Sequence, residues 1–192
     1  MVSADPIQIE RWSAHPARLN DDVEMLGEVL HACVHAGGSV SFILPFTPGD
    51  AQAFWRAEVL PAVRDGSRVL LVARRNGRIV GTVQLDLATP PNQPHRAEVR
   101  KLLVHPEARR QGMAKLLMAA AEEEARQARR TLLTLDTVTH GAAEPLYLSL
   151  GYVAIGIIPR YALNFNSSGL EATTVMYKNL DQDQAVFGDP RK

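Results

Sequence analysis

The sequence predicts a mixed α/β protein, in which helices flank one central sheet that combines antiparallel strands with a parallel pair. Two long segments, 19–34 and 113–128, repeat apolar residues at the three- and four-residue spacing of amphipathic helices. Two strand-like segments, 97–104 and 132–137, stand on either side of the second helix, so the later strand must return parallel to the earlier one. A doubly wound fold, in which strand and helix alternate throughout, does not have this order of elements.

A first strand and two helices are predicted in the N-terminal part of the chain. Residues 7–12 alternate in polarity, as a half-buried strand does. The glycine pair Gly37-Gly38 ends the first helix. Thr47 is the expected cap of the second helix and is followed by a proline at the first helical position. Pro61 is expected to bend or split this helix, because proline lacks the backbone N–H that an interior position needs.

The central and C-terminal elements follow from turn signals and apolar periodicity. The Asn-Gly pair at 76–77 lies between strands 68–73 and 78–87 and predicts a tight hairpin. Three prolines mark residues 88–94 as a loop. The buried stripe of the long helix is expected to consist of Met113, Leu116, Leu117, Ala120, Ala121, Ala125 and Ala128. A short helix, a strand, a loop and a last strand are then expected at residues 142–150, 152–158, 159–169 and 170–177.

Composition is that of an ordinary globular protein. The 192 residues predict a single domain over residues 1–180, with a polar tail at 181–192 that is expected to be disordered. The 21 basic and 21 acidic residues cancel, so no nucleic-acid partner is expected. No apolar run is long enough to span a bilayer, and no signal peptide is recognisable, so we expect a cytoplasmic protein without a membrane partner. The single cysteine, Cys33, excludes an intrachain disulfide and is interpreted as a core residue.

The most informative segment joins the strand 97–104 to the helix 113–128. Gly112 has no Cβ, so another group can approach the backbone closely there. The first turn of a helix carries N–H groups without partners and the positive end of the helix dipole, which together suit a diphosphate. Arg109 and Arg110 add positive charge just before this turn. So short a pattern also occurs in unrelated loops, but its position between an apolar strand and a long helix is the one that the mechanism requires.

The pattern Arg109-x-x-Gly112-x-Ala114 resembles the acetyl-CoA signature of the GNAT superfamily of N-acetyltransferases. The resemblance extends over residues 98–152 and implies a sheet whose central parallel strands splay apart to admit the pantetheine arm of acetyl-CoA. It also implies an oxyanion contact from a backbone N–H at Leu103. His140 stands where the family has an asparagine that contacts pantetheine, and its imidazole can still form a hydrogen bond. The residues expected to bind acetyl-CoA are therefore Leu103, Val104, Arg109, Arg110, Gln111, Gly112, Met113, Ala114, Lys115 and His140.

Within the superfamily, the chain resembles the tabtoxin-resistance acetyltransferases, which act on an amino-acid-like toxin. The shared segments are Gly38-Ser39-Val40-x-Phe42, Arg96-Ala97-Glu98-Val99-x-Lys101-Leu102, Leu135-Asp136-Thr137, and Tyr147 six residues after Gly141. This resemblance implies that Glu98 and Asp136, on the two parallel strands, act as general base for the acceptor amine, directly or through water. The residues alone leave two alternatives open, a solvated strand residue for Glu98 and a strand-end cap for Asp136.

Tyr147 opens the segment Tyr-Leu-Ser-Leu-Gly-Tyr, which is similar to another GNAT signature. The resemblance implies that its hydroxyl protonates or hydrogen-bonds the coenzyme A sulfur. A buried structural tyrosine is the alternative.

We therefore expect an acetyl-CoA-dependent N-acetyltransferase that acts by direct attack on a small-molecule amine, such as an amino-acid-like metabolite, toxin or antibiotic. A protein N-acetyltransferase and a non-catalytic acyl-CoA sensor are the alternatives. The acceptor pocket is expected from residues 34–46 and 159–169, and a homodimer is a further expectation from the resemblance. No metal is expected, since His31 and His35 are four residues apart on a helix but have no third ligand at a matching spacing.

Overall fold

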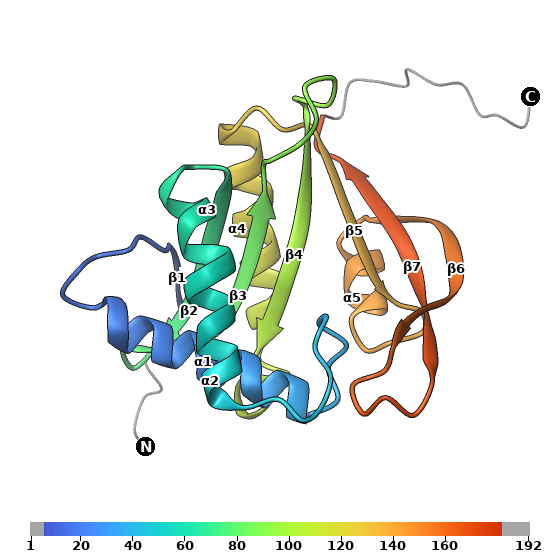
Figure 1. The fold of residues 1–192 in the computed structure, drawn as a ribbon. Helices are drawn as coiled ribbons and strands as arrows, with labels where there is room; N and C mark the ends of the chain where they lie inside the picture. Colours follow the sequence, from blue (N-terminus) through green and yellow to red (C-terminus); the bar gives the residue numbers. More distant parts are fainter. Residues whose placement is uncertain (1–5, 182–192) are drawn as a thin grey trace, which may run out of the picture.

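A computed structural model describes residues 6–181 and contains one seven-stranded sheet in the order β1-β2-β3-β4-β5-β7-β6 (Figure 1). The strands are β1 Gln8–Arg11, β2 Arg68–Arg75, β3 Arg78–Asp86, β4 Arg96–Val104, β5 Leu132–Val138, β6 Val153–Leu163 and β7 Leu170–Asn179. The helices are α1 Leu19–His35, α2 Pro48–Phe54, α3 Leu60–Arg64, α4 Met113–Gln127 and α5 Glu144–Ser149. Among the described strands, β4 and β5 pair in parallel and the other neighbours pair antiparallel, which confirms the predicted mixed α/β class.

The sheet lies between two layers of helices (Figure 1). On β2, Val69, Leu71 and Ala73 pack in the core cluster that contains α4, whereas Leu70 and Val72 pack in the cluster that contains α1 and α2. This alternation follows from the two-residue period of a strand. Both faces of the sheet are therefore covered by apolar side chains.

Helix α4 has the predicted position but not quite the predicted buried face. Its buried apolar side chains are Met113, Leu117, Met118, Ala121 and Ala125. Leu116 is 46% exposed, so its assignment to the core was wrong. The stripe is centred on Ala121, and at 3.6 residues per turn Met118 lies closer to that centre than Leu116 does.

The predicted cap and interruption of the second helix, and the predicted hairpin turn, are confirmed. Thr47 and Asp50 form a capping box, with Thr47 Oγ1 accepting from the Asp50 N–H at 3.1 Å and Asp50 Oδ2 accepting from the Thr47 N–H at 2.9 Å. The helix is split as expected, because a π-helical turn over Trp55–Val59 precedes α3 and its Pro61. A wider turn just before a proline accommodates the missing N–H. The Asn76-Gly77 turn has two positive φ angles, as the hairpin requires.

The C-terminal strands differ from the prediction. β6 continues to Leu163, so residues 159–163 form strand and the connecting loop is reduced to 164–169. The pairing of β6 with β7 shifts register between Ile158 and Ala162. Pro159 lies within this shift, and an edge strand tolerates a proline because no neighbouring strand needs its backbone N–H. Of the predicted tail, residues 182–192 lie outside the described part of the chain.

The two central strands separate after a short paired stretch. β4 and β5 are in register from Arg96↔Leu132 to Glu98↔Thr134, and both strands continue beyond this point without pairing. β4 also has an irregularity against β3 near Lys101, whose φ is +50°. The expected splay of the parallel pair is therefore present, and it opens toward the carboxyl ends of both strands.

Candidate active site

Two cavities lie at the carboxyl ends of the splayed strands. The first, called here the donor cavity, measures about 410 Å³ and is bounded by the end of β4, the start of α4 and α5. Its lining includes Val104, Arg109, Arg110, Gly112, Met113, Ala114 and Lys115, together with Ala108, Pro145, Leu146 and Ser149. Most residues predicted to bind acetyl-CoA are thus brought to one cavity.

The donor cavity has backbone donors ready for an anion. Gly112 is the N-cap of α4, with φ +78° and no side-chain cap. Among the described residues, the N–H groups of Gly112, Met113 and Ala114 have no hydrogen-bond partner. A Cβ added at Gly112 would meet nothing within 4 Å, so there is open space beside the backbone at this helix start. This geometry suits a phosphate group, and it fits the diphosphate of coenzyme A.

Three predicted cofactor residues lie outside the donor cavity. The Leu103 side chain is buried among the residues that pack on α1, so only its main chain remains for a cofactor. Gln111 is exposed and accepts a hydrogen bond from Arg75 at 2.6 Å. The His140 side chain is 88% exposed, while its backbone N–H donates to the Glu144 carboxylate. Contacts from these residues to pantetheine or to an oxyanion remain predictions.

The second cavity, called here the acceptor cavity, measures about 240 Å³. It is lined by the irregular connector between α1 and α2, by β5 and by the β6–β7 pair, and thus joins residues more than 130 positions apart in sequence. The lining residues are Ser39, Ser41, Phe42, Ile43, Asp136, Thr137, Val138, Tyr161, Ala162, Leu163, Glu171, Ala172 and Thr173. Parts of the two segments expected to form an acceptor pocket therefore meet here.

Asp136 lies on the wall of the acceptor cavity. Thr173, which is 4% exposed, places its Oγ1 2.9 Å from Asp136 Oδ2 and 2.9 Å from the Thr137 carbonyl oxygen. The hydroxyl can donate to a carboxylate, or accept from a protonated carboxyl group while donating to the carbonyl. Asp136 sits within β5, opposite Val175, and accepts no backbone N–H among the described residues. The strand-end cap is therefore not its role, and Thr173 is a neighbour that sequence patterns did not reveal.

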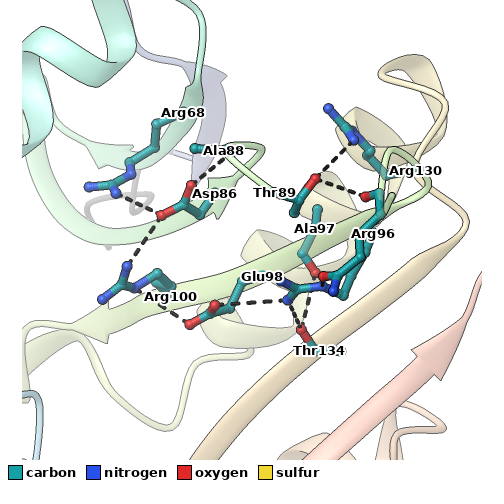
Figure 2. Close-up of polar contacts among 11 residues, drawn as sticks. Arg68, Asp86, Ala88, Thr89, Arg96, Ala97, Glu98, Arg100, Arg130 and Thr134 are labelled. Carbon is teal, nitrogen blue, oxygen red and sulfur yellow. Dashed lines mark hydrogen bonds and ion pairs between the residues drawn. The ribbon is translucent and has the colours of Figure 1, made fainter. Parts of the chain in front are cut away.

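Glu98 lies farther back, where β4 and β5 are still paired. Figure 2 shows its carboxylate between Arg96 and Arg100, at 4.0 and 3.7 Å. Arg96 also donates to Thr134 on β5, and Arg100 also pairs with Asp86 on β3 (Figure 2). Glu98 lines neither cavity, whereas Asp136 lines the acceptor cavity, so a shared cleft for the two carboxylates remains a prediction.

Tyr147 lines neither cavity but lies near residues of both. It belongs to α5, whose Pro145, Leu146 and Ser149 line the donor cavity, while burial and the charge of Asp136 raise its pKa above the ordinary value. The side chain is 7% exposed and packs edge to face on Tyr152, with ring centroids 5.7 Å apart. The hydroxyl therefore keeps its proton at neutral pH.

Lys101 is a second residue that the sequence patterns did not single out as chemical. Burial lowers its pKa to about 8, an effect that Arg100 strengthens and that Asp136 opposes. Its Nζ donates to Ser41 Oγ at 3.0 Å. Lysine is rarely found inside a protein, so its position in the middle of a central strand could have indicated a functional role for Lys101.

The histidine and cysteine interpretations also have structural outcomes. The rings of His31 and His35 are tilted by 33° with centroids 4.1 Å apart, and within residues 6–181 no group of three metal-ligating side chains was found. Cys33 is buried, as expected for a core residue. In the described part of the chain, no helix has both the length and the apolarity needed to cross a bilayer.

Comparison with known proteins gives consistent results. The family model described as acetyltransferase (GNAT) family matches residues 40–152. An uncharacterised N-acetyltransferase of the hisH-hisA intergenic region of Azospirillum brasilense is 32% identical over 117 residues, which cover 60% of this chain and 67% of that protein.

Two solved structures illustrate the similarity of fold. The yncA protein of Salmonella typhimurium, solved with its cofactor acetyl-CoA, aligns with a TM-score of 0.73 at 18% identity, over 96% of this chain and 100% of that one. A ribosomal-protein-alanine N-acetyltransferase of Brucella melitensis aligns with a TM-score of 0.71 at 22% identity, over 90% and 99% of the two chains.

Proposed function

The chain belongs to the acetyltransferase (GNAT) family, and on that premise we propose that it transfers the acetyl group of acetyl-CoA to the amine of a small molecule by direct attack. The observation that carries the proposal is the position of Tyr147. It belongs to α5, which lines part of the donor cavity, and the charge of Asp136 in the acceptor cavity contributes to the rise of its pKa. A thioester beside Tyr147 would therefore be within reach of an amine beside Asp136.

Asp136 is the better candidate for the general base, because it lines the acceptor cavity and Glu98 does not. An attacking amine must lose a proton, and a carboxylate in contact with it can accept that proton directly or through water. Thr173 orients the Asp136 carboxylate and can remain hydrogen-bonded to it in both protonation states. Glu98, which is held between two arginines, contributes negative charge behind the cavity.

Tyr147 acts as a hydrogen-bond donor to the thioester sulfur. A free thiol has a pKa of about 8.5, whereas burial raises the pKa of this phenol above its ordinary value of about 10. Complete proton transfer from the phenol to a thiolate would therefore be unfavourable. A hydrogen bond that strengthens as negative charge develops on sulfur still lowers the barrier.

The small size of the acceptor cavity supports a small-molecule acceptor. At about 240 Å³ it suits an amino acid or a small amine better than a folded protein surface. The amino-acid-like toxin of the tabtoxin-resistance enzymes belongs to this size class, and the resemblance of the sequence segments makes it a candidate. The likeness to a ribosomal-protein acetyltransferase concerns the fold alone, so a protein acceptor remains the alternative to be tested.

A screen of acceptors with acetyl-CoA, followed by release of the free thiol, tests the proposal. The panel would contain amino acids, simple amines, amine-bearing antibiotics, a tabtoxin-type β-lactam and peptides with free N-termini. We expect acceptor-dependent thiol release with one or more small molecules, and its loss in Asp136→Asn. Turnover confined to peptides would favour a protein acetyltransferase, and tight acetyl-CoA binding without turnover would favour a sensor.

A further inference from the structure

Lys101 is partly buried and uses only part of its hydrogen-bonding capacity. Its ammonium group donates to Ser41 Oγ and lies 5.6 and 5.7 Å from the ring centroids of Phe42 and Phe54. No carboxylate lies within 4.0 Å of Nζ among the described residues, although an ammonium can donate three hydrogen bonds. A charge withdrawn from water in this way is unfavourable unless an anionic partner is supplied.

Backbone strain on both sides supports a functional reason for this arrangement. Lys101 has φ +50° and Ser41 has φ +75°, a left-handed region that residues with a Cβ rarely occupy. The two residues are 60 positions apart, and their side chains are joined by the hydrogen bond between Nζ and Oγ. Strained conformations of this kind persist where the surrounding structure enforces them, and they concentrate at functional sites.

The position of Lys101 relates it to the acceptor cavity. Ser41 and Phe42, two of the residues that contact the ammonium group, line that cavity, as does Asp136. Asp136 is near enough to raise the pKa of Lys101, but the two side chains do not form an ion pair. A positive group beside Ser41 and a negative group at Asp136 are thus both associated with one small cavity, which suits a ligand that carries an opposite pair of charges.

We propose that Lys101, with Ser41, binds a carboxylate of the acceptor, so that the acceptor is an amino acid or a close analogue whose amine is directed to Asp136. This inference rests on the proposed function and adds to it a residue that selects the acceptor. The carboxylate provides the missing partner of the ammonium group. The amine, at the other end of the same small molecule, is then adjacent to the carboxylate that accepts its proton.

Matched acceptor pairs test this inference. Each pair consists of an amino acid and the amine that remains when its carboxylate is removed, and kcat/KM is measured for wild type, Lys101→Met and Lys101→Arg. Wild type should favour the carboxylate member. Lys101→Met should reduce that preference about 10- to 100-fold, as expected for the loss of a charge-assisted hydrogen bond. Lys101→Arg should restore part of it, because its charge is retained.

A second measurement does not depend on turnover. Thermal shift with amino acids as probes should reveal stabilisation of wild type that is absent with the decarboxylated amines and absent in Lys101→Met. An equal preference in wild type and Lys101→Met would overturn the inference and assign Lys101 to balancing the charges of Asp136 and Glu98. If no acceptor is turned over but carboxylate-dependent binding is lost in Lys101→Met, the proposed function fails and the binding role of Lys101 stands.

Discussion

The donor and acceptor cavities are built in different ways. The donor cavity is formed mainly by residues within 104–115, at the end of β4 and the start of α4, with a smaller part from α5, and its anion site consists of backbone N–H groups around Gly112. The acceptor cavity is formed by side chains from four separate stretches of the chain, among them Ser41, Asp136 and Thr173. The part of the site built from local backbone is therefore readable as a sequence motif, whereas the part proposed to select the acceptor is not.

The largest expected effect concerns the backbone site of the donor cavity. Gly112→Val should weaken acetyl-CoA binding about 1,000-fold, since a side chain in front of the free N–H groups displaces about two charge-assisted hydrogen bonds. Calorimetric titration with acetyl-CoA measures this loss.

Gly77→Val is the matched control. Gly77 has φ +76° and equally open space around its Cβ position, but it lies in the β2–β3 hairpin. Both variants should lose similar thermal stability from backbone strain. Equal acetyl-CoA affinity in the two folded variants would contradict the phosphate-site assignment.

The next effect concerns the carboxylates of the acceptor side. Glu98→Gln combined with Asp136→Asn should lower kcat at least about 100-fold, within the range for a general base, with acetyl-CoA affinity little changed. Asp136→Asn alone should account for most of the loss, because Glu98 lies outside the acceptor cavity. Rates must be measured where chemistry limits turnover, and near wild-type turnover of the double variant would remove both residues from the mechanism.

Substitution of Tyr147 should have a moderate effect on rate. Tyr147→Phe keeps the ring that packs on Tyr152 and should lower kcat about 10- to 100-fold, with KM for acetyl-CoA nearly constant. Tyr152→Phe is the control, since the Tyr152 hydroxyl is buried without a hydrogen-bond partner among the described residues. Its kcat should remain within about twofold of wild type. The opposite result, a lowered melting temperature and normal kcat in Tyr147→Phe, would make Tyr147 a packing residue.

The smallest expected effect is on stability and its pH dependence. Burial lowers the pKa of Lys101 from 10.5 to about 8, so the folded protein binds this proton less tightly than the unfolded chain does. The wild type should therefore gain stability as pH rises from about 8 to 10.5. Besides burial, the charges of Arg100, Asp136, Arg68 and Glu98 influence this pKa, and Ser41 accepts a hydrogen bond from the ammonium group.

At pH 7, Lys101→Met should be about 1–3 kcal/mol more stable than wild type, after loss of the Ser41 hydrogen bond is included. The difference should be small at pH 10.5, where Lys101 is uncharged in the folded protein and already half deprotonated in the unfolded chain. Chemical denaturation at the two pH values measures it. A variant that is less stable at pH 7 would indicate that Lys101 serves the fold rather than the acceptor.

Much of the fold was determined by the sequence alone, because its signals are local. Apolar spacing, the Thr47 cap and the Asn76-Gly77 turn act within a few residues, and the helix between β4 and β5 imposes their parallel pairing. Gly112 belongs to the same class, because a helix start forms its anion site without distant partners. The failures at Leu116 and at residues 159–163 arose where neighbouring elements decide what is buried or paired.

Only the tertiary structure decided the acceptor side. The neighbouring strands hold the two arginines beside Glu98, through Thr134 for Arg96 and Asp86 for Arg100, while β5 and β7 bring Thr173 to Asp136. The bulge in β4 directs Lys101 toward Ser41 on a connector with no regular structure. These contacts join side chains that are far apart in the sequence, so no rule of residue spacing predicts them. They form only after both faces of the sheet have packed against their helices.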